Sequence, residues 1–135
     1  MIDEYNAIYK KIHPKTKKPA IEKPRHPSIN QWMILRRPMM NALKQRWKDF
    51  GIWWLKKLGY DGLMLDKVKV EITVFMPTRR RADIDNHCCE KFLWDAFTEA
   101  GFWVDDDYLH VTEIISGMGY DKENPRTELI ITTID

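Results

Sequence analysis

Residues 66–76, DKVKVEITVFM, carry the pattern that most restricts how this chain can fold. Val68, Val70, Ile72 and Val74 alternate with charged or polar side chains along the whole stretch. Successive side chains of a strand point to opposite faces, so this period of two predicts a strand with one buried face. The chain must therefore contain a sheet that is covered on one side.

Helical spacing appears earlier in the chain, over residues 39–59. Pro38 suits the first turn of a helix, where its missing N–H costs nothing, and Gly59 suits the C-terminal cap. Gly51 weakens the middle of this helix by about 1 kcal/mol relative to alanine. The apolar stripe that would face the core is Met40, Leu43, Trp47, Phe50, Trp54 and Leu58.

The second half of the chain repeats the change from helix to strand. A helical pattern runs from about Asn86 to Ala100 and ends at Gly101, and strands are expected over about 108–118 and 127–134, separated by the turn DKENP. We therefore expect an α+β fold: a small mixed sheet of about four strands packed against two main helices. A length of 135 residues fits one such domain.

Residues 1–30 differ from the rest and are expected to form an irregular basic arm ahead of a domain spanning 31–135. Pro14, Pro19, Pro24 and Pro27 alternate with lysines there, and prolines interrupt helices and remove backbone donors. The pattern is compatible with an ordered arm and with a mobile tail.

The composition, 44% hydrophobic and 31% charged, is that of a globular rather than a disordered protein. No apolar run approaches the roughly 18 residues that a membrane span needs, and the first residues, MIDEYNAIYKK, lack the apolar region of a signal peptide. Cys88 and Cys89 are neighbours and cannot close a loop, which indicates reduced thiols. We expect a cytoplasmic protein with no membrane partner.

The small net charge of +2 hides a separation of charge along the chain. Residues 10–48 contain twelve basic side chains and one acidic side chain, a net of +11, whereas residues 83–107 contain eight acidic and one basic, a net of −7. A basic arm beside an acidic centre suits a protein that binds a polyanion and holds a cation. A solvated charged surface could produce the same pattern.

The stretch RRRADIDNHCCEKF, residues 79–92, places Asp83 and Asp85 one residue apart where the first strand ends. An extended backbone would point both carboxylates to the same face, where they repel unless a cation lies between them. Mg²⁺ binds one or two carboxylates together with waters and phosphate oxygens. The alternative is a solvated loop in which Asp85 or Asn86 caps a helix.

A third carboxylate is available from the run Asp105–Asp107, which precedes the next expected strand. Together with the arginine triplet of residues 79–81, three carboxylates on adjacent strand ends indicate metal-assisted hydrolysis of a phosphodiester. In isolation each piece has a plainer explanation: the acidic run as a solvated turn, and the arginines as a solvated face.

The order of these pieces resembles the RusA family of Holliday-junction resolvases. RRRADIDN is followed by K-x-x-x-D-A-F over residues 91–97 and by AGFWVDD over residues 100–106, and the resemblance extends over roughly residues 68–134. HPSIN at residues 26–30 resembles an early segment of the family more weakly. The resemblance implies a homodimer of small α+β subunits that nicks four-way DNA junctions symmetrically with Mg²⁺ or Mn²⁺ and needs no small-molecule cofactor.

Residue roles follow from the same resemblance. Asp83 and Asp85 correspond to the first two metal-binding aspartates, Asp106 to the third, and Lys91 to the catalytic lysine; Asp105 or Asp107 could share the metal role. The cationic side chains expected to contact DNA are Arg36, Arg37, Arg79, Arg80, Arg81 and Lys91.

The sequence departs from the family pattern at the lysine. Lys91 follows Asp85 by six residues where the family has four, and we place the two extra residues in a widened turn at the start of the helix. Ala82 stands where relatives often carry a basic residue.

Three other functions remain open: a nuclease of this fold acting on forks or flaps, a DNA-binding module without turnover, and a structural dimer with a solvated acidic loop. A zinc site at residues 87–89 is disfavoured because adjacent ligands reach one tetrahedral ion poorly. Four tryptophans are expected in the core or a dimer interface rather than stacked on bases: Trp47, Trp53, Trp54 and Trp94.

Overall fold

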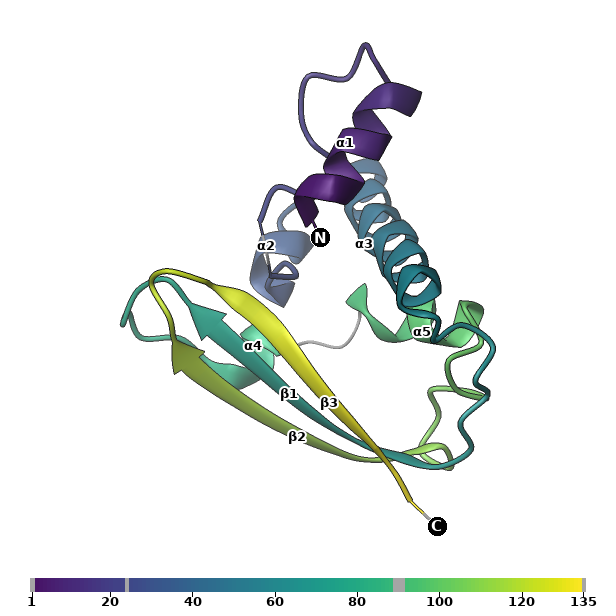
Figure 1. Ribbon diagram of the computed structural model, residues 1–135. Helices are drawn as coiled ribbons and strands as arrows, with labels where there is room; N and C mark the ends of the chain where they lie inside the picture. Colours follow the sequence, from purple (N-terminus) through teal and green to yellow (C-terminus); the bar gives the residue numbers. More distant parts are fainter. Residues whose placement is uncertain (1, 24, 89–91, 135) are drawn as a thin grey trace.

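The computed structural model describes residues 2–23, 25–88 and 92–134, with the backbone alone at Asp85. Five helices and three strands follow one another within these residues (Figure 1). Their bounds are α1 Ile2–Ile12, α2 Ile29–Met33, α3 Arg37–Leu58, β1 Val68–Met76, α4 Ile84–His87, α5 Trp94–Glu99, β2 Val111–Tyr120 and β3 Arg126–Thr133.

The sheet has the order β2-β1-β3, with β1 parallel to β2 and antiparallel to β3. In Figure 1 the sheet forms a long twisted ribbon, and α1, α2 and α3 lie together on one side of it. The α+β class is confirmed, but the expected four strands are three in the described residues. The segment before β1 reaches only a single bridge between Leu65 and Trp103, because left-handed backbone at Gly62 (φ 73°) and Met64 (φ 52°) interrupts the extended chain.

The alternating pattern of β1 is confirmed by its burial. Val68, Val70, Ile72 and Val74 are at most 1% exposed, while the side chains between them are half-buried. Residues of α5 and of the following loop, Phe97 and Trp103 among them, pack on the N-terminal half of this row, and Cys88 packs on the C-terminal half. The apolar row of β1 is thus the floor of the core.

Helix α3 is confirmed with the expected ends. Pro38 lies in its first turn, and Gly59 closes it in the left-handed conformation with φ 77°. Trp47 and Phe50 are buried as predicted, and Trp94 of α5 is buried too, whereas Leu58 at the end of the stripe is 42% exposed. Trp53 and Trp54 are half-buried.

The contact of α3 with α5 explains the glycine in the middle of the long helix. A Cβ atom at Gly51 would lie 2.7 Å from the Cβ of Ala96, closer than carbon atoms approach without a shift of the backbone. Beside this contact, Lys44 pairs with Asp95 at 3.5 Å and Lys48 pairs with Glu99 at 3.4 Å. Gly51 therefore sets how closely the two helices pack.

The prediction that residues 1–30 are irregular is wrong for Ile2–Ile12, which form α1. The prolines begin at residue 14, so they leave the earlier residues free to form α1. Tyr5 packs against Phe50 and Trp53 at ring distances of 5.3 and 5.2 Å, and the Asn6 side chain exchanges two hydrogen bonds with the backbone of Ile21. The chain after α1 is therefore fixed against α3.

The predicted continuous helix over 86–100 is also wrong. Helix α4 ends at His87 and α5 begins at Trp94, while residues 89–91 lie outside the described part. On one helix, residues four apart share a face, yet Cys88 packs with Ile72 and Val74 whereas Phe92 packs in a different cluster with Trp47.

The last two strands are confirmed, each within a few residues of its expected bounds. The intervening turn is held by Asp121, whose carboxylate accepts hydrogen bonds from the backbone N–H groups of Glu123 and Asn124. Nowhere in the described ranges is a helix both long and apolar enough to cross a membrane.

Substituting Gly51→Ala should lower the free energy of unfolding. Overpacking against Ala96 costs about 1–3 kcal/mol, which should exceed the roughly 1 kcal/mol that alanine gains in helix propensity. Urea unfolding followed by circular dichroism measures the difference. Ala96→Gly in the same chain removes the clash, so the double variant should be more stable than the sum of the two single effects. If Gly51→Ala alone raised the free energy of unfolding by about 1 kcal/mol, the close packing of α3 on α5 would be contradicted.

Candidate active site

The first acidic motif begins where α4 begins. Asp83 is the N-cap of α4, with extended backbone (φ −96°, ψ 130°), and its side chain makes no capping hydrogen bond. Asp85 is in the first turn of α4, and its side chain lies outside the described part. The expectation that both aspartates lie on extended backbone is therefore wrong at Asp85, because the helix starts one residue after Asp83.

The predicted DNA-binding arginines are exposed at two places. Arg79, Arg80 and Arg81 lie in the loop between β1 and α4, and Arg36 and Arg37 begin α3. Arg79 lies 4.3 Å above the ring of Tyr120, a cation–π contact that holds its side chain against the end of β2. Lys91 falls outside the described residues, so its position relative to the aspartates stays a prediction.

The segment HPSIN at residues 26–30 packs beside the first acidic motif. The side-chain oxygen of Asn86 accepts a hydrogen bond from the backbone N–H of Asn30 at 2.9 Å. Ser28 and Gln31 form a capping box at the start of α2, which fixes this backbone. The two stretches therefore meet in space, although 56 residues separate the bonded pair. The sequence of HPSIN resembles the family weakly, but nothing in the sequence indicated that Asn30 would contact Asn86.

His26 of the same segment is buried. Its Nδ1 lies 3.0 Å from the hydroxyl of Thr127 on β3, while Nε2 makes no hydrogen bond within the described residues. Burial, aided by the charge of Arg25, lowers the pKa of His26 to about 4, although the nearby backbone of His87 favours the charged form somewhat. His26 is therefore neutral at pH 7 and anchors the segment to the sheet.

The second acidic run serves partly to start β2. One carboxylate oxygen of Asp107 accepts hydrogen bonds from the backbone N–H groups of Leu109 and His110, and lies 2.6 Å from Nδ1 of His110. The bond with His110 holds the pKa of Asp107 below its usual value. Asp66 lies 3.7 Å from the other ring nitrogen of the same histidine. These contacts assign Asp107 a structural role that sequence analysis missed, since His110 had no visible partner.

Asp106, in contrast to Asp107, has a carboxyl pKa above its usual value. Its side chain is exposed, yet its pKa is raised by partial desolvation, by the adjacent Asp105 side chain and by the charges of Asp105 and Asp95. Desolvation is the largest of these causes, and the neighbouring carboxylates add to it; such shifts are frequent among functional carboxylates. Asp105 accepts a hydrogen bond from the backbone N–H of Asp106 at 2.8 Å. Asp106 is therefore better suited than Asp107 to receive a cation.

The two acidic runs lie toward opposite ends of the β1–β2 pair. Asp83 follows the C-terminal end of β1, whereas Asp106 precedes β2, whose first residue Val111 pairs with Val68 at the N-terminal end of β1. Nine residues of strand span roughly 26 Å. Figure 1 shows α4 along one part of the sheet and the chain before β2 at the other end.

Within the described residues, no group of three or more histidine, cysteine, aspartate or glutamate side chains could hold a metal ion. The Asp85 side chain lies outside these residues, so a group that includes Asp85 stays a prediction, and only the register of β1 and β2 bears on the separation of Asp83 from Asp106. Cys88 donates a hydrogen bond from its thiol to the carbonyl of Gly117 and packs in the core, consistent with a packing role rather than a zinc site.

Comparison with known proteins gives a family match over most of the chain. The model of the family described as Endodeoxyribonuclease RusA matches residues 11–132. A crossover junction endodeoxyribonuclease rusA from Enterobacteria phage 82 is 50% identical over 80 residues, covering 53% of this chain and 60% of the relative.

A crossover junction endodeoxyribonuclease RusA from Escherichia coli (strain K12) is 44% identical over 69 residues, covering 48% of this chain and 51% of the relative. The chain thus spans about half to three-fifths of the length of these relatives. Because the family match includes both acidic runs, HPSIN and the arginine triplet, the chain belongs to the RusA family.

Proposed function

We propose that this protein is a Mg²⁺-dependent, structure-selective endonuclease that resolves Holliday junctions by paired symmetric nicks. The observation that carries the proposal is the family match over residues 11–132, which joins the arginine loop to both acidic runs. The relatives matched over half to three-fifths of their length are named crossover junction endodeoxyribonucleases. Branched DNA is the substrate that those names specify.

Asp83, Asp85 and Asp106 would hold the ion, Mg²⁺ or Mn²⁺. Oxygen ligands of carboxylates suit either metal, the Asp83 side chain is not used as a cap, and the raised pKa of Asp106 marks a carboxylate without a compensating charge. When bound, the ion would polarise the scissile phosphate and lower the pKa of the attacking water. Lys91 would contact the same phosphate and stabilise its developing negative charge.

A homodimer would assemble this site. Asp83 and Asp106 are separated along β1 in one subunit, so a second copy would supply the missing acidic run to each site. The sheet offers a surface for such pairing, because Ile115 and Ile130 flank Glu71 on its open face and are 43% and 58% exposed. Two-fold symmetry would also give one active site for each strand that is cut.

The arginine loop and the start of α3 would bind the DNA backbone. Arg79, Arg80 and Arg81 would contact phosphates near the scissile bond. Arg36 and Arg37 would contact phosphates farther along the same duplex arm of the DNA junction. Phosphate contacts position the protein without reading sequence, and they make binding depend steeply on salt. The basic chain between α1 and α2 would add further phosphate contacts, and the protein would act in the cytoplasm.

Asp83→Asn or Asp85→Asn should abolish cleavage of a synthetic four-way junction and leave its binding within about twofold, because an amide removes the charge that holds the ion but no phosphate contact. Gel assays with and without Mg²⁺ measure both properties. Mixing Asp83→Asn with Asp106→Asn subunits should restore nicking at one of the two sites if each site draws on both subunits. Cleavage by Asp83→Asn at the wild-type rate would refute the metal assignment, and failure of the mixture alone would refute the shared site.

Asp106→Asn should raise the free energy of unfolding at pH 7 by a few tenths of a kcal/mol, since the ionised carboxylate is repelled by its neighbours but is largely screened by solvent. A raised carboxyl pKa costs stability as pH rises through the unfolded-state value of 3.8, so the gain should vanish below that pH. Urea unfolding between pH 3 and pH 7, without added metal, tests this. A variant less stable than wild type at pH 7 would show that Asp106 is held by favourable contacts instead.

Arg80→Ala should weaken junction binding by a similar factor for every junction sequence and reduce the slope of log affinity against log salt by about 1. Lys56→Ala is the matched control, because it removes an exposed cation near the far end of α3. Anisotropy titrations at several salt concentrations measure both variants. If Arg80→Ala changed the choice of cut site without changing affinity, its positioning role would be wrong.

A further inference from the structure

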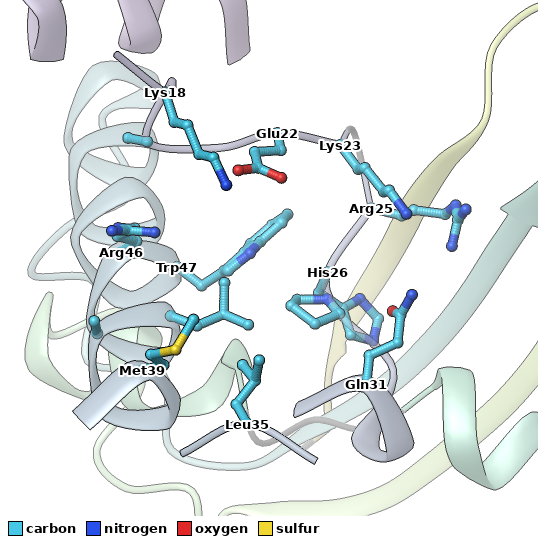
Figure 2. Close-up of a pocket in the computed structure, with 14 residues that line it drawn as sticks. Lys18, Glu22, Lys23, Arg25, His26, Gln31, Leu35, Met39, Arg46 and Trp47 are labelled. Carbon is cyan, nitrogen blue, oxygen red and sulfur yellow. The ribbon is translucent and has the colours of Figure 1, made fainter. Parts of the chain in front are cut away.

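A cavity of about 420 Å³ lies between the chain that follows α1 and one face of α3 (Figure 2). Its size is within the range of about 300–1,000 Å³ that small-molecule sites occupy. Residues from the segment 18–27 form one wall, Gln31 and Leu35 close one end, and α3 forms the opposite wall. Nothing in the proposed nuclease chemistry uses this cavity.

The wall opposite α3 is held in place by buried contacts. Ala20 and Ile21 are at most 4% exposed and pack with Trp47, Phe50 and Phe92. The hydrogen bonds of Asn6 to Ile21, and the contact of His26 with Thr127, fix the two ends of this wall. The cavity is therefore a built feature of the fold.

The inside of the cavity is largely apolar on the α3 side. Met39 and Trp47 project from α3, and Leu35 adds an aliphatic side chain (Figure 2). Leu43 of α3 also lines the cavity. His26, which also lines the cavity, is uncharged at neutral pH because burial lowers its pKa to about 4. A flat, uncharged group would be accommodated on this side.

The rest of the lining is cationic. Lys18, Lys23, Arg25 and Arg46 line the cavity, against the single carboxylate of Glu22, which gives a net charge of +3. None of these four cations is in an ion pair within the described ranges, whereas Lys44 and Lys48 of the same helix α3 are paired with acids of α5. The fold thus neutralises the side of α3 that faces α5 and leaves the cavity side unneutralised.

We propose that this cavity binds a single deoxynucleotide, with its base against the apolar side and its phosphate against the four cations. An aromatic base joined to a phosphate matches both halves of the lining, and stacking of a base on an aromatic side chain such as Trp47 is tolerant of sequence. The identification of DNA as the source rests on the proposed function: the nucleotide would be an unpaired one at a branch point. A free mononucleotide has the same chemistry and is the other possible source.

The test compares two four-way junctions that differ by one unpaired deoxycytidine at the branch point. Wild-type protein should bind the junction with the unpaired nucleotide about tenfold more tightly, which corresponds to 1.4 kcal/mol. Ala42→Phe places a ring in the cavity from an exposed position on α3 and should reduce this preference to less than about twofold, while binding of the fully paired junction stays unchanged. Arg46→Ala should reduce the preference too, and Lys56→Ala, outside the cavity on the same helix, should not.

A second arm uses free deoxycytidine 5′-monophosphate, with binding followed by calorimetry. Binding to wild type but not to Ala42→Phe, with no preference between the junctions, would assign the cavity to free nucleotides and overturn the DNA source. Absence of both effects would overturn the nucleotide site altogether. Cleavage of the fully paired junction with Mg²⁺ is measured in parallel. If the wild-type protein did not cleave this junction, the nuclease proposal would be refuted, while the binding results would still test the cavity.

Discussion

The parallel pairing of β1 with β2 determines at which ends of these strands the two acidic runs leave and enter the sheet. The register from Val68↔Val111 to Met76↔Tyr120 fixes two neighbouring strands that run the same way. The chain must therefore cross back over the sheet between them, and it does so through α4 and α5. A segment that follows β1 and one that precedes β2 are then placed toward opposite ends of the pair. The acidic runs at Asp83 and Asp106 are two such segments, which is why a second subunit is part of the proposed site.

The cations of α3 that face α5 are paired with acids, whereas the one that faces the cavity is unpaired within the described residues. Lys44 and Lys48 are paired with Asp95 and Glu99, so they hold α5 against the long helix. Arg46 lies toward the cavity, where it joins three cations of the preceding segment. Of the twelve basic side chains over residues 10–48, two are therefore paired with acids of α5 and four line the cavity.

The sequence predicted a helix or strand correctly where the local signals agreed with the tertiary packing, and wrongly where they did not. The strand β1 and the helix α3 were predicted well, because alternation, Pro38 and Gly59 act locally. The helix expected over 86–100 was not, since Cys88 and Phe92 are buried in different clusters and no periodicity shows which cluster a residue joins. The fourth strand was expected without a place in the chain, and the described residues contain three.

For the candidate site, the residue types and their order along the chain predicted which aspartates would bind metal. These roles remain predictions. Their arrangement could not be predicted, because it depends on the direction of β2 relative to β1 and, in the proposed dimer, on which subunit would supply each residue. The contact between Asn30 and Asn86 joins segments far apart in the chain, so no local pattern contains it.

The most direct test of the nuclease account is to incubate the protein with a synthetic four-way junction and to map the cut positions on each labelled strand. The account predicts nicks at symmetry-related positions in two opposing strands, in the presence of Mg²⁺ and not after its removal with a chelator. Intact strands under both conditions, or nicks that persist without a divalent cation, would contradict it.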